Sequence, residues 1–164
     1  MRKILTSGLL AMTMVIASPV PSVYADSAVE SLSPELRALL SKEMLALQDG
    51  MKAIFPAYIS GDLTTIAKIA HEIKHSYIMK QSITSAQKHE LKSKLPKAFI
   101  QSDKQFHKYA GMLEHVAKEK HLELVGFYYS KLTESCVGCH SEYATHRFPD
   151  LKEKSHGHDK GDHH

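Results

Sequence analysis

The run Cys136-Val137-Gly138-Cys139-His140 constrains this chain more than any other feature, because it holds the only two cysteines among 164 residues. On a helix, positions three apart project from one face, so both thiols can reach one edge of a flat ring. A C-x-x-C-H run is the attachment signal for c-type haem: the thiols bind the porphyrin covalently, and the adjacent imidazole becomes an axial iron ligand. We therefore predict one haem c per chain, attached to Cys136 and Cys139 and ligated by His140.

Three other interpretations of the motif stay open at this point. A thioredoxin-like redox pair requires a βαβ context, and this chain has almost no strand pattern. A structural disulfide leaves His140 unexplained. A zinc site needs two further ligands, and twelve histidines could supply them, although no second paired motif is present.

Residues 1–25 have the features of a secretory signal peptide. Arg2 and Lys3 provide the positive start, residues 4–17 the apolar stretch, and Val23-Tyr24-Ala25 a small-residue cleavage site. The apolar stretch is short for a membrane span, so we expect no span after cleavage; an uncleaved N-terminal anchor is the alternative. Haem is attached to such motifs on the outer side of the bacterial inner membrane, so we predict a periplasmic protein.

Cleavage after residue 25 would leave 139 residues with 19 basic and 18 acidic side chains. This length suffices for one domain with one core, which we assign to residues 26–149. A near-neutral charge without a basic stripe gives no indication of nucleic-acid binding. Residues 150–164 are polar and His-rich, which predicts a disordered tail; binding of copper, nickel or zinc by its imidazoles is the alternative.

Ser33-Pro34-Glu35 predicts a helix start, with the Ser33 hydroxyl as the cap and proline in the first turn. Apolar residues then recur at helical spacing up to residue 58, and Gly61 marks a turn. They form one wide inward stripe: Leu36, Leu39, Leu40, Met44, Leu47, Met51, Ile54, Phe55 and Tyr58.

Further helices are predicted over residues 63–82, from residue 96 or 102 to residue 120, and from residue 122 into the C-x-x-C-H motif. A short surface helix is expected over residues 85–94, in the connection. The inward positions of the three long helices are Ile66, Ile69, Ala70, Ile73, Tyr77, Phe99, Phe106, Ala110, Leu113, Val116, Leu124, Val125, Tyr128 and Leu132. We therefore expect an all-α fold, an antiparallel four-helix bundle with covalently bound haem at the C-terminal helix.

A haem motif that closes the last helix of such a bundle resembles the class II c-type cytochromes, the cytochrome c prime family. The resemblance covers residues 32–148 and includes Tyr143, since the family usually carries an aromatic three residues after the ligand histidine. Two features depart from the family pattern. Ala144 stands where the family often has arginine, and the polar segment 85–94 is an insertion.

The resemblance implies a choice at the sixth iron position. Five-coordinate members leave it open and bind small gases such as nitric oxide, whereas six-coordinate members fill it with a methionine of the first helix and transfer electrons. Counting back from Gly61, that family position falls at Leu45 or Met44. Met44 is on the predicted inward stripe, and a thioether is a suitable soft iron ligand, so we expect His140/Met44 ligation, with Met51 as the reserve candidate.

The expected function is one-electron transfer by a periplasmic mono-haem cytochrome that is not an enzyme and that acts with periplasmic redox proteins. A five-coordinate gas-binding protein and a periplasmic metal-handling protein that uses its His-rich tail are the alternatives. Dimers are usual in the family, so a homodimer is an expectation that rests on the resemblance alone.

Other polar residues are expected to be ordinary surface positions. His71 and His75 have a metal-compatible i, i+4 spacing, but their lysine neighbours indicate a solvated flank. His107 and His115 share a face of the third long helix and offer a bis-histidine alternative. Glu114, Glu119 and Glu123 alternate with lysines, as on exposed helix faces.

Overall fold

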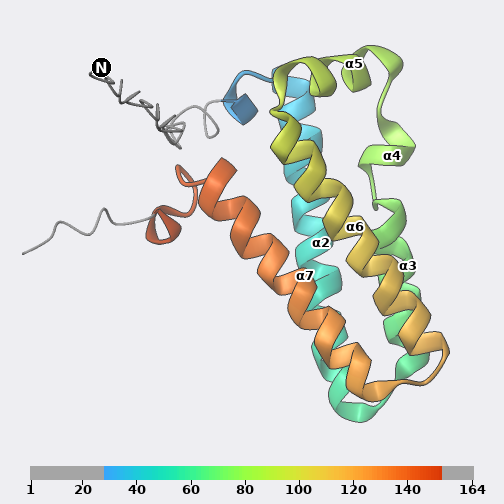
Figure 1. The fold of residues 1–164 in the computed structure, drawn as a ribbon. Coiled ribbons are helices and arrows are strands. Elements are labelled where there is room, and N and C mark those ends of the chain that lie inside the picture. The colour runs from blue at the N-terminus through green and yellow to red at the C-terminus, as the bar shows by residue number, and fades with distance from the viewer. Residues whose placement is uncertain (1–27, 153–164) are drawn as a thin grey trace, which may run out of the picture.

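The computed structural model describes residues 28–152, and every regular element in that range is helical (Figure 1). The prediction of an all-α chain is confirmed for these residues. The predicted signal peptide and the tail beyond residue 152 lie outside the described part. No helix within residues 28–152 has the length and apolar character needed to cross a membrane.

Four long helices make up most of the structure: α2 (Pro34–Ser60), α3 (Leu63–His75), α6 (Lys97–Lys118) and α7 (Leu122–Tyr143). In Figure 1, α2 and α6 run downward, and α3 and α7 return upward. The connection between α3 and α6 carries the short helices α4 (Met79–Ser82) and α5 (Ser85–Lys94), and a 3-10 turn, η1 (Pro149–Leu151), follows α7.

The sequence predicted some features of the two ends of α2 correctly. Proline occupies its first turn, and Gly61 ends it in the left-handed conformation, at φ 72°, which favours glycine. The prediction that the Ser33 hydroxyl caps α2 is wrong. The Ser33 backbone N–H and hydroxyl instead donate to the two carboxylate oxygens of Glu90 on α5, at 2.6 and 3.0 Å.

The predicted helix over residues 63–82 is interrupted, because α3 ends at His75 and Ser76 has a φ of +65°. The cause is Glu43, whose buried carboxylate lies beside this point. It accepts hydrogen bonds of 2.7–3.0 Å from the Ser76 hydroxyl and from the next three backbone N–H groups, those of Tyr77, Ile78 and Met79. A carboxylate of α2 therefore supplies acceptors that stabilise the break in the helix.

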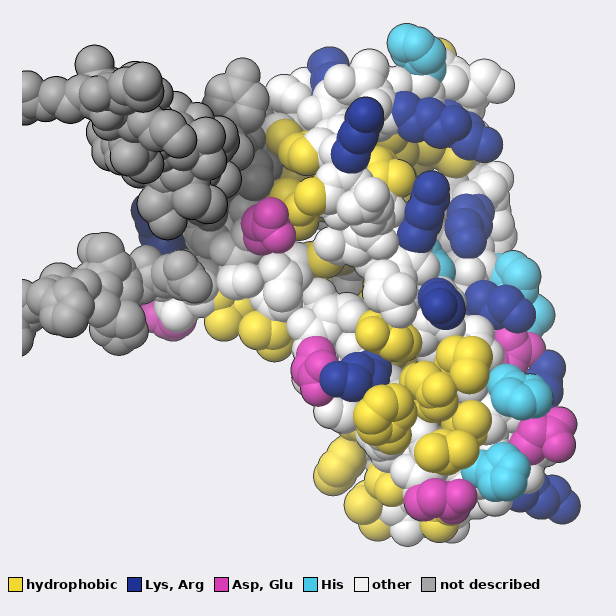
Figure 2. Space-filling model, in the orientation of Figure 1, with side chains coloured by type: hydrophobic (Ala, Val, Ile, Leu, Met, Phe, Trp, Pro, Cys, Tyr) yellow, Lys and Arg dark blue, Asp and Glu magenta, His cyan; other side chains and the backbone are white. Residues whose placement is uncertain are grey.

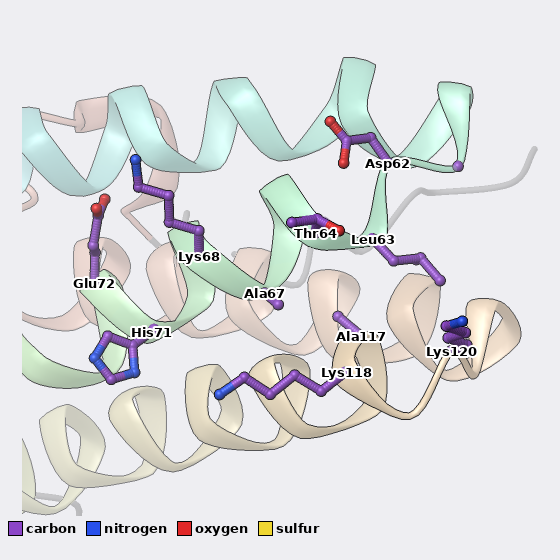
Figure 3. Close-up of a pocket in the computed structure, with 11 residues that line it drawn as sticks. Asp62, Leu63, Thr64, Ala67, Lys68, His71, Glu72, Ala117, Lys118 and Lys120 are labelled. Carbon is purple, nitrogen blue, oxygen red and sulfur yellow. The ribbon is translucent and has the colours of Figure 1, made fainter.

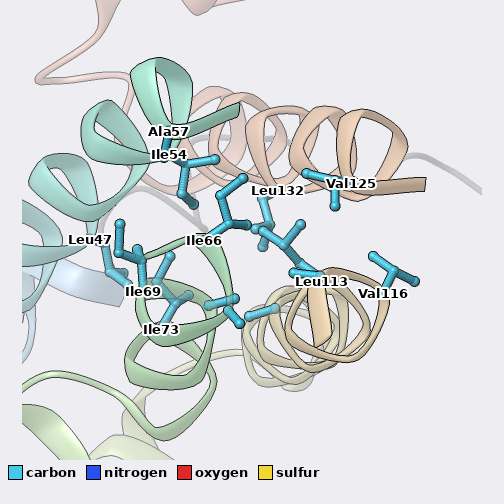
Figure 4. Packing of buried hydrophobic residues seen from close by; sticks show 14 of the residues in the cluster. Leu47, Ile54, Ala57, Ile66, Ile69, Ile73, Leu113, Val116, Val125 and Leu132 are labelled. Atoms are coloured by element: carbon cyan, nitrogen blue, oxygen red, sulfur yellow. The ribbon is translucent and has the colours of Figure 1, made fainter. Parts of the chain in front are cut away.

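The core between the long helices consists of aliphatic side chains from all four (Figure 4). α3 packs against α2 and α6, and α7 packs mainly along α6. Most of the predicted inward residues of these helices are buried: Ile66, Ile69, Ala70, Ile73, Phe106, Ala110, Leu113, Val116, Val125 and Leu132. A smaller cluster around Leu32, Leu36 and Leu95 fills the end near α5.

The apolar stripe of α2 is narrower than predicted. Met44 is 40% exposed and Phe55 is 57% exposed, so neither lies in the core, and Leu124 of α7 is also exposed. Glu43 takes the interior position beside Met44 because its carboxylate binds the chain after α3. Consecutive residues of a helix are rotated by about 100°, so Met44 faces another side of α2.

Candidate functional site

The C-x-x-C-H motif forms part of the last turns of α7, as predicted. The side chains of Cys136, Cys139 and His140 are half-buried, and both thiols are free. Cys136 packs against the core, whereas Cys139 lines a small polar pocket with Ser102 and other residues of α6. Spacings of three and four residues place the three groups along one side of the helix.

The surroundings of the thiols are unlike those of a redox-active pair. Burial raises the pKa of Cys136, and burial together with nearby negative groups raises the pKa of Cys139 to about 11. Reactive C-x-x-C pairs have lowered thiol pKa values, typically at the positive N-terminal end of a helix. This pair is at the opposite end of its helix, so the thioredoxin-like interpretation has no structural support.

The imidazole of His140 lies parallel to the ring of Phe148, with 4.1 Å between the ring centroids and 8° between the planes. Burial lowers the pKa of His140. The lowered pKa favours the neutral ring, in which one nitrogen keeps the lone pair that a metal ligand requires. Phe148 is the residue near the site that sequence reasoning missed, although an aromatic side chain shortly after a helix end was the available signal.

Tyr143 lies one turn beyond His140 and packs its ring edge-on against Phe99 of α6, with 5.0 Å between centroids. Its side chain is buried, and within residues 28–152 its hydroxyl has no hydrogen-bond partner. Burial raises the pKa of Tyr143 to about 12, to which the charge of Glu142 contributes. A buried hydroxyl without a partner is costly, and here it lies beside the motif.

Met44, Met51 and Tyr58 are seven residues apart and so share one side of α2, and α2 contacts α7 through the Tyr58 side chain and the backbone of Met51. The Tyr58 hydroxyl packs on Gly126 of α7, only 2.6 Å from where a Cβ atom would be, so a side chain at residue 126 would displace this hydroxyl. The Tyr129 hydroxyl reaches the backbone carbonyl of Met51 at 3.4 Å. These contacts define the side on which the two helices meet.

The same contacts give the register of α2 and α7. Met44 precedes Tyr58 by 14 residues, and His140 follows Gly126 by 14 residues. The helices run in opposite directions and rise about 1.5 Å per residue, so Met44 and His140 lie at about the same level along the helix axes. Met51 is seven residues nearer the Tyr58 contact, which is about 10 Å along the axis.

In Figure 1, α7 crosses α2 at the lower end and diverges from it toward the motif. This divergence agrees with the exposure of Met44 and of Thr133, which lies midway between Gly126 and His140 on α7. The donor set therefore consists of two thiols and a neutral imidazole on one helix and a thioether at the same level on the facing helix. Two thiols, an imidazole and a thioether are the donor types that a c-type haem would require.

His71 and His75 are exposed, as expected for a solvated flank, whereas His107 makes a specific contact. His107 Nδ1 lies 2.8 Å from the Ile73 carbonyl oxygen, so this ring joins α6 to the end of α3. His71 and His75 contact each other at 4.4 Å between ring centroids. Within residues 28–152, no group of three or more His, Cys, Asp or Glu side chains could hold a metal ion.

Glu114 is not on an exposed face, contrary to the sequence prediction. Its carboxylate is buried in α6 and binds Lys118, Lys74 and His71. Hydrogen bonds from these partners, the largest from Lys118, lower the pKa of Glu114 to about 2. His71 and Lys118 also line an open groove near the Gly61 turn (Figure 3), which lies at the end of the molecule opposite His140.

Comparison with models of protein families, with curated proteins and with solved structures gives no match for this chain.

Proposed function

We propose that this protein is a periplasmic c-type cytochrome that carries one haem and transfers single electrons. Its four long helices would form an antiparallel four-helix bundle, with the haem attached to Cys136 and Cys139 and ligated by His140 and Met44. The observation that carries this proposal is the C-x-x-C-H motif on the last turns of α7, at about the level of Met44 on α2.

Each residue of the site has a role in this function. The two thiols would hold the macrocycle covalently, the imidazole of His140 would donate one lone pair to the iron, and the thioether of Met44 would donate another. Haem, when bound, would supply the iron that takes up and releases a single electron. Because His140 and Met44 belong to helices, they would hold their donor atoms in place in both oxidation states, and little would have to reorganise when an electron enters or leaves.

The register of α2 and α7 favours Met44 over Met51 as the sixth ligand. Met51 lies about 10 Å further along the axis from the level of His140, and its side chain packs against the core. Met44 shares that level and is partly exposed. It can therefore turn toward a bound group without leaving a cavity in the core.

The first experiment measures the mass and the optical spectrum of the purified protein. We expect the mass of one haem above that of the polypeptide, and a low-spin spectrum that carbon monoxide changes only slowly. Met44→Ala should give a high-spin spectrum and rapid carbon monoxide binding, because it removes the sixth ligand. Met51→Ala is the matched control and should remain low-spin.

Several results would contradict the proposal. A colourless protein of polypeptide mass would exclude the haem assignment. Rapid carbon monoxide binding by the unaltered protein would favour the five-coordinate gas-binding alternative. A high-spin Met51→Ala variant together with a low-spin Met44→Ala variant would transfer the ligand role to Met51.

The surface offers a contact region for a redox partner. Figure 2 shows Lys and Arg side chains gathered on the upper part of one face. The exposed lysines of α5 and of the first part of α6 are Lys88, Lys92, Lys94, Lys97, Lys104 and Lys108. Such a surface favours partners with acidic surfaces, and their association should slow as ionic strength rises.

Export and oligomeric state need separate measurements. Mass spectrometry of the protein from the periplasm should give a chain that begins at Asp26. Deleting residues 153–164 should leave the haem spectrum unchanged; a defect restricted to metal stress would favour the metal-handling alternative. Sedimentation of the purified protein tests the expected homodimer.

A further inference from the structure

The chain after α7 folds back so that Phe148 covers one face of the His140 ring. We call residues 144–148 the proximal strap. The Ala144 N–H donates to the His140 carbonyl at 3.2 Å, and the Ala144 carbonyl accepts from the N–H groups of Arg147 and Phe148 at 2.9 and 3.0 Å. These bonds form a compact turn that returns an aromatic ring to the last turn of the helix.

The proximal strap is also attached to the N-terminal part of the described chain. Arg147 Nη1 lies 3.5 Å from the Ser41 hydroxyl on α2, and His146 Nε2 lies 3.1 Å from a carboxylate oxygen of Glu30. Ser41 is three residues before Met44, which is almost one helical turn. The strap therefore connects the helix end that carries His140 with the part of α2 that carries Met44.

Within residues 28–152, neither ring nitrogen of His140 has a protein hydrogen-bond partner. Histidines that bind metals usually donate their second N–H to a carbonyl or carboxylate, which fixes the rotation of the ring. The torsion that turns an imidazole about its Cβ–Cγ bond is broad when nothing restrains it. The parallel contact with Phe148 supplies such a restraint here.

We propose that Phe148 is a positioning residue that sets the orientation of the axial imidazole of His140 and shields one face of that ring from water. This inference rests on the proposed function, because it assigns His140 as the iron ligand. Turning the ring out of its plane would break the stack with Phe148. Water near the ligand favours the ferric state, which carries the larger positive charge, so the shield raises the reduction potential.

The test uses the haem-loaded protein and the variants Phe148→Leu and Phe148→Tyr, with Phe55→Leu as the matched control. Phe55 is an exposed phenylalanine at the opposite end of α2. Mass spectrometry first establishes that each protein carries haem. The readouts are the reduction potential and the NMR shifts of the haem methyl groups in the ferric protein, whose order reports the plane of the axial imidazole.

Phe148→Leu should lower the reduction potential and change the order of the methyl shifts. Phe148→Tyr, which keeps the ring, should restore both, and Phe55→Leu should match the unaltered protein. The inference is overturned if Phe148→Leu leaves both readouts unchanged, or if Phe148→Tyr departs from the unaltered protein as far as Phe148→Leu does.

One measurement on the unaltered protein does not depend on any variant. Nuclear Overhauser contacts between the ring protons of His140 and Phe148 should be present, and their absence overturns the inference even if Phe148→Leu does not accumulate. A chain without haem would contradict the proposed function and the ligand-positioning role that rests on it. The ring contacts would still show separately whether Phe148 covers His140.

Discussion

Glu114 shows how a single buried carboxylate can join two helices. Lys118 lies one turn further along α6, whereas Lys74 and His71 reach the carboxylate from α3. These partners are about half exposed, so water screens part of each attraction. The stabilisation comes mainly from keeping the buried oxygens hydrogen-bonded.

Replacing Glu114 by glutamine should lower the free energy of unfolding by about 1–2 kcal/mol at pH 7. Lys118 and Lys74 donate hydrogen bonds to different oxygens of Glu114, and an amide replaces one of these oxygens by an NH₂ group that cannot accept. Urea denaturation followed by circular dichroism measures this loss. The control is Glu119→Gln on the exposed end of the same helix, which makes the same change in net charge and should have little effect.

The contribution of Glu114 should depend on pH in one direction. Its pKa is lowered to about 2 in the folded protein from an ordinary value of 4.5. The carboxylate therefore stabilises the fold fully above about pH 4.5, and this stabilisation is lost as the pH falls toward 2. The stability difference between the unaltered protein and Glu114→Gln should shrink over that interval, and a constant difference would contradict this account.

At the scale of elements, the break between α3 and α4 depends on Glu43. Its two oxygens accept hydrogen bonds from one hydroxyl and three backbone N–H groups. A glutamine amide in their place would direct its own N–H donors toward some of these groups, which are donors themselves. Glu43→Gln should lower the free energy of unfolding by about 3 kcal/mol. Amide hydrogen exchange at Tyr77, Ile78 and Met79 should become faster.

Glu35→Gln is the matched control for this prediction, because Glu35 is an exposed acid in the first turn of the same helix. It should leave exchange at residues 77–79 unchanged. If Glu43→Gln also leaves that exchange unchanged, the carboxylate does not maintain the break.

Short sequence patterns correctly predicted those elements whose ends are determined by residues nearby in the chain. Pro34 and Gly61 mark the two ends of α2, and residues 85–94 form the expected short helix, which starts with a capping box at Thr84. The break at Ser76 could not be predicted in this way, because its acceptor is 33 residues earlier in the chain. The outward position of Met44 was missed for the same reason, since Glu43 was not expected to be buried.

In the candidate site too, only the residues that belong to a short sequence motif could be predicted directly. Cys136, Cys139 and His140 follow from one short motif. The common level of Met44 and His140 follows from two antiparallel helices and a contact at Gly126 that only the structure reveals. Phe148 could not be assigned from spacing, because the turn that returns it to His140 depends on backbone bonds beyond the last helix.

At the scale of the whole molecule, α7 packs mainly along α6 and meets α2 through tyrosine side chains. A group bound between Met44 and His140 would join α7 to α2 at their open end. The double variant Cys136→Ser/Cys139→Ser, which cannot attach haem, should therefore unfold at a temperature about 10 °C lower, equivalent to about 2–3 kcal/mol for a chain of this size.

Hydrogen exchange should identify where that stability is lost. We expect faster exchange over residues 132–143 of α7 and little change in α3, which is packed between α2 and α6. Val137→Ser is the control, because it alters the exposed residue between the cysteines and leaves both thiols in place. Equal exchange in the double variant and the unaltered protein would show that α7 does not depend on the attached group.

The contact between His146 and Glu30 brings both ends of the described chain to the same pole of the molecule, beside the motif. A fluorescent protein or an electrode linker fused directly to residue 28 or residue 152 would therefore lie next to the proposed electron-entry site, where it would obstruct access or connect the site to an electrode. The exposed turn at Gly61 is at the other pole. It is the position at which a label can be inserted while the proposed electron-transfer surface stays free.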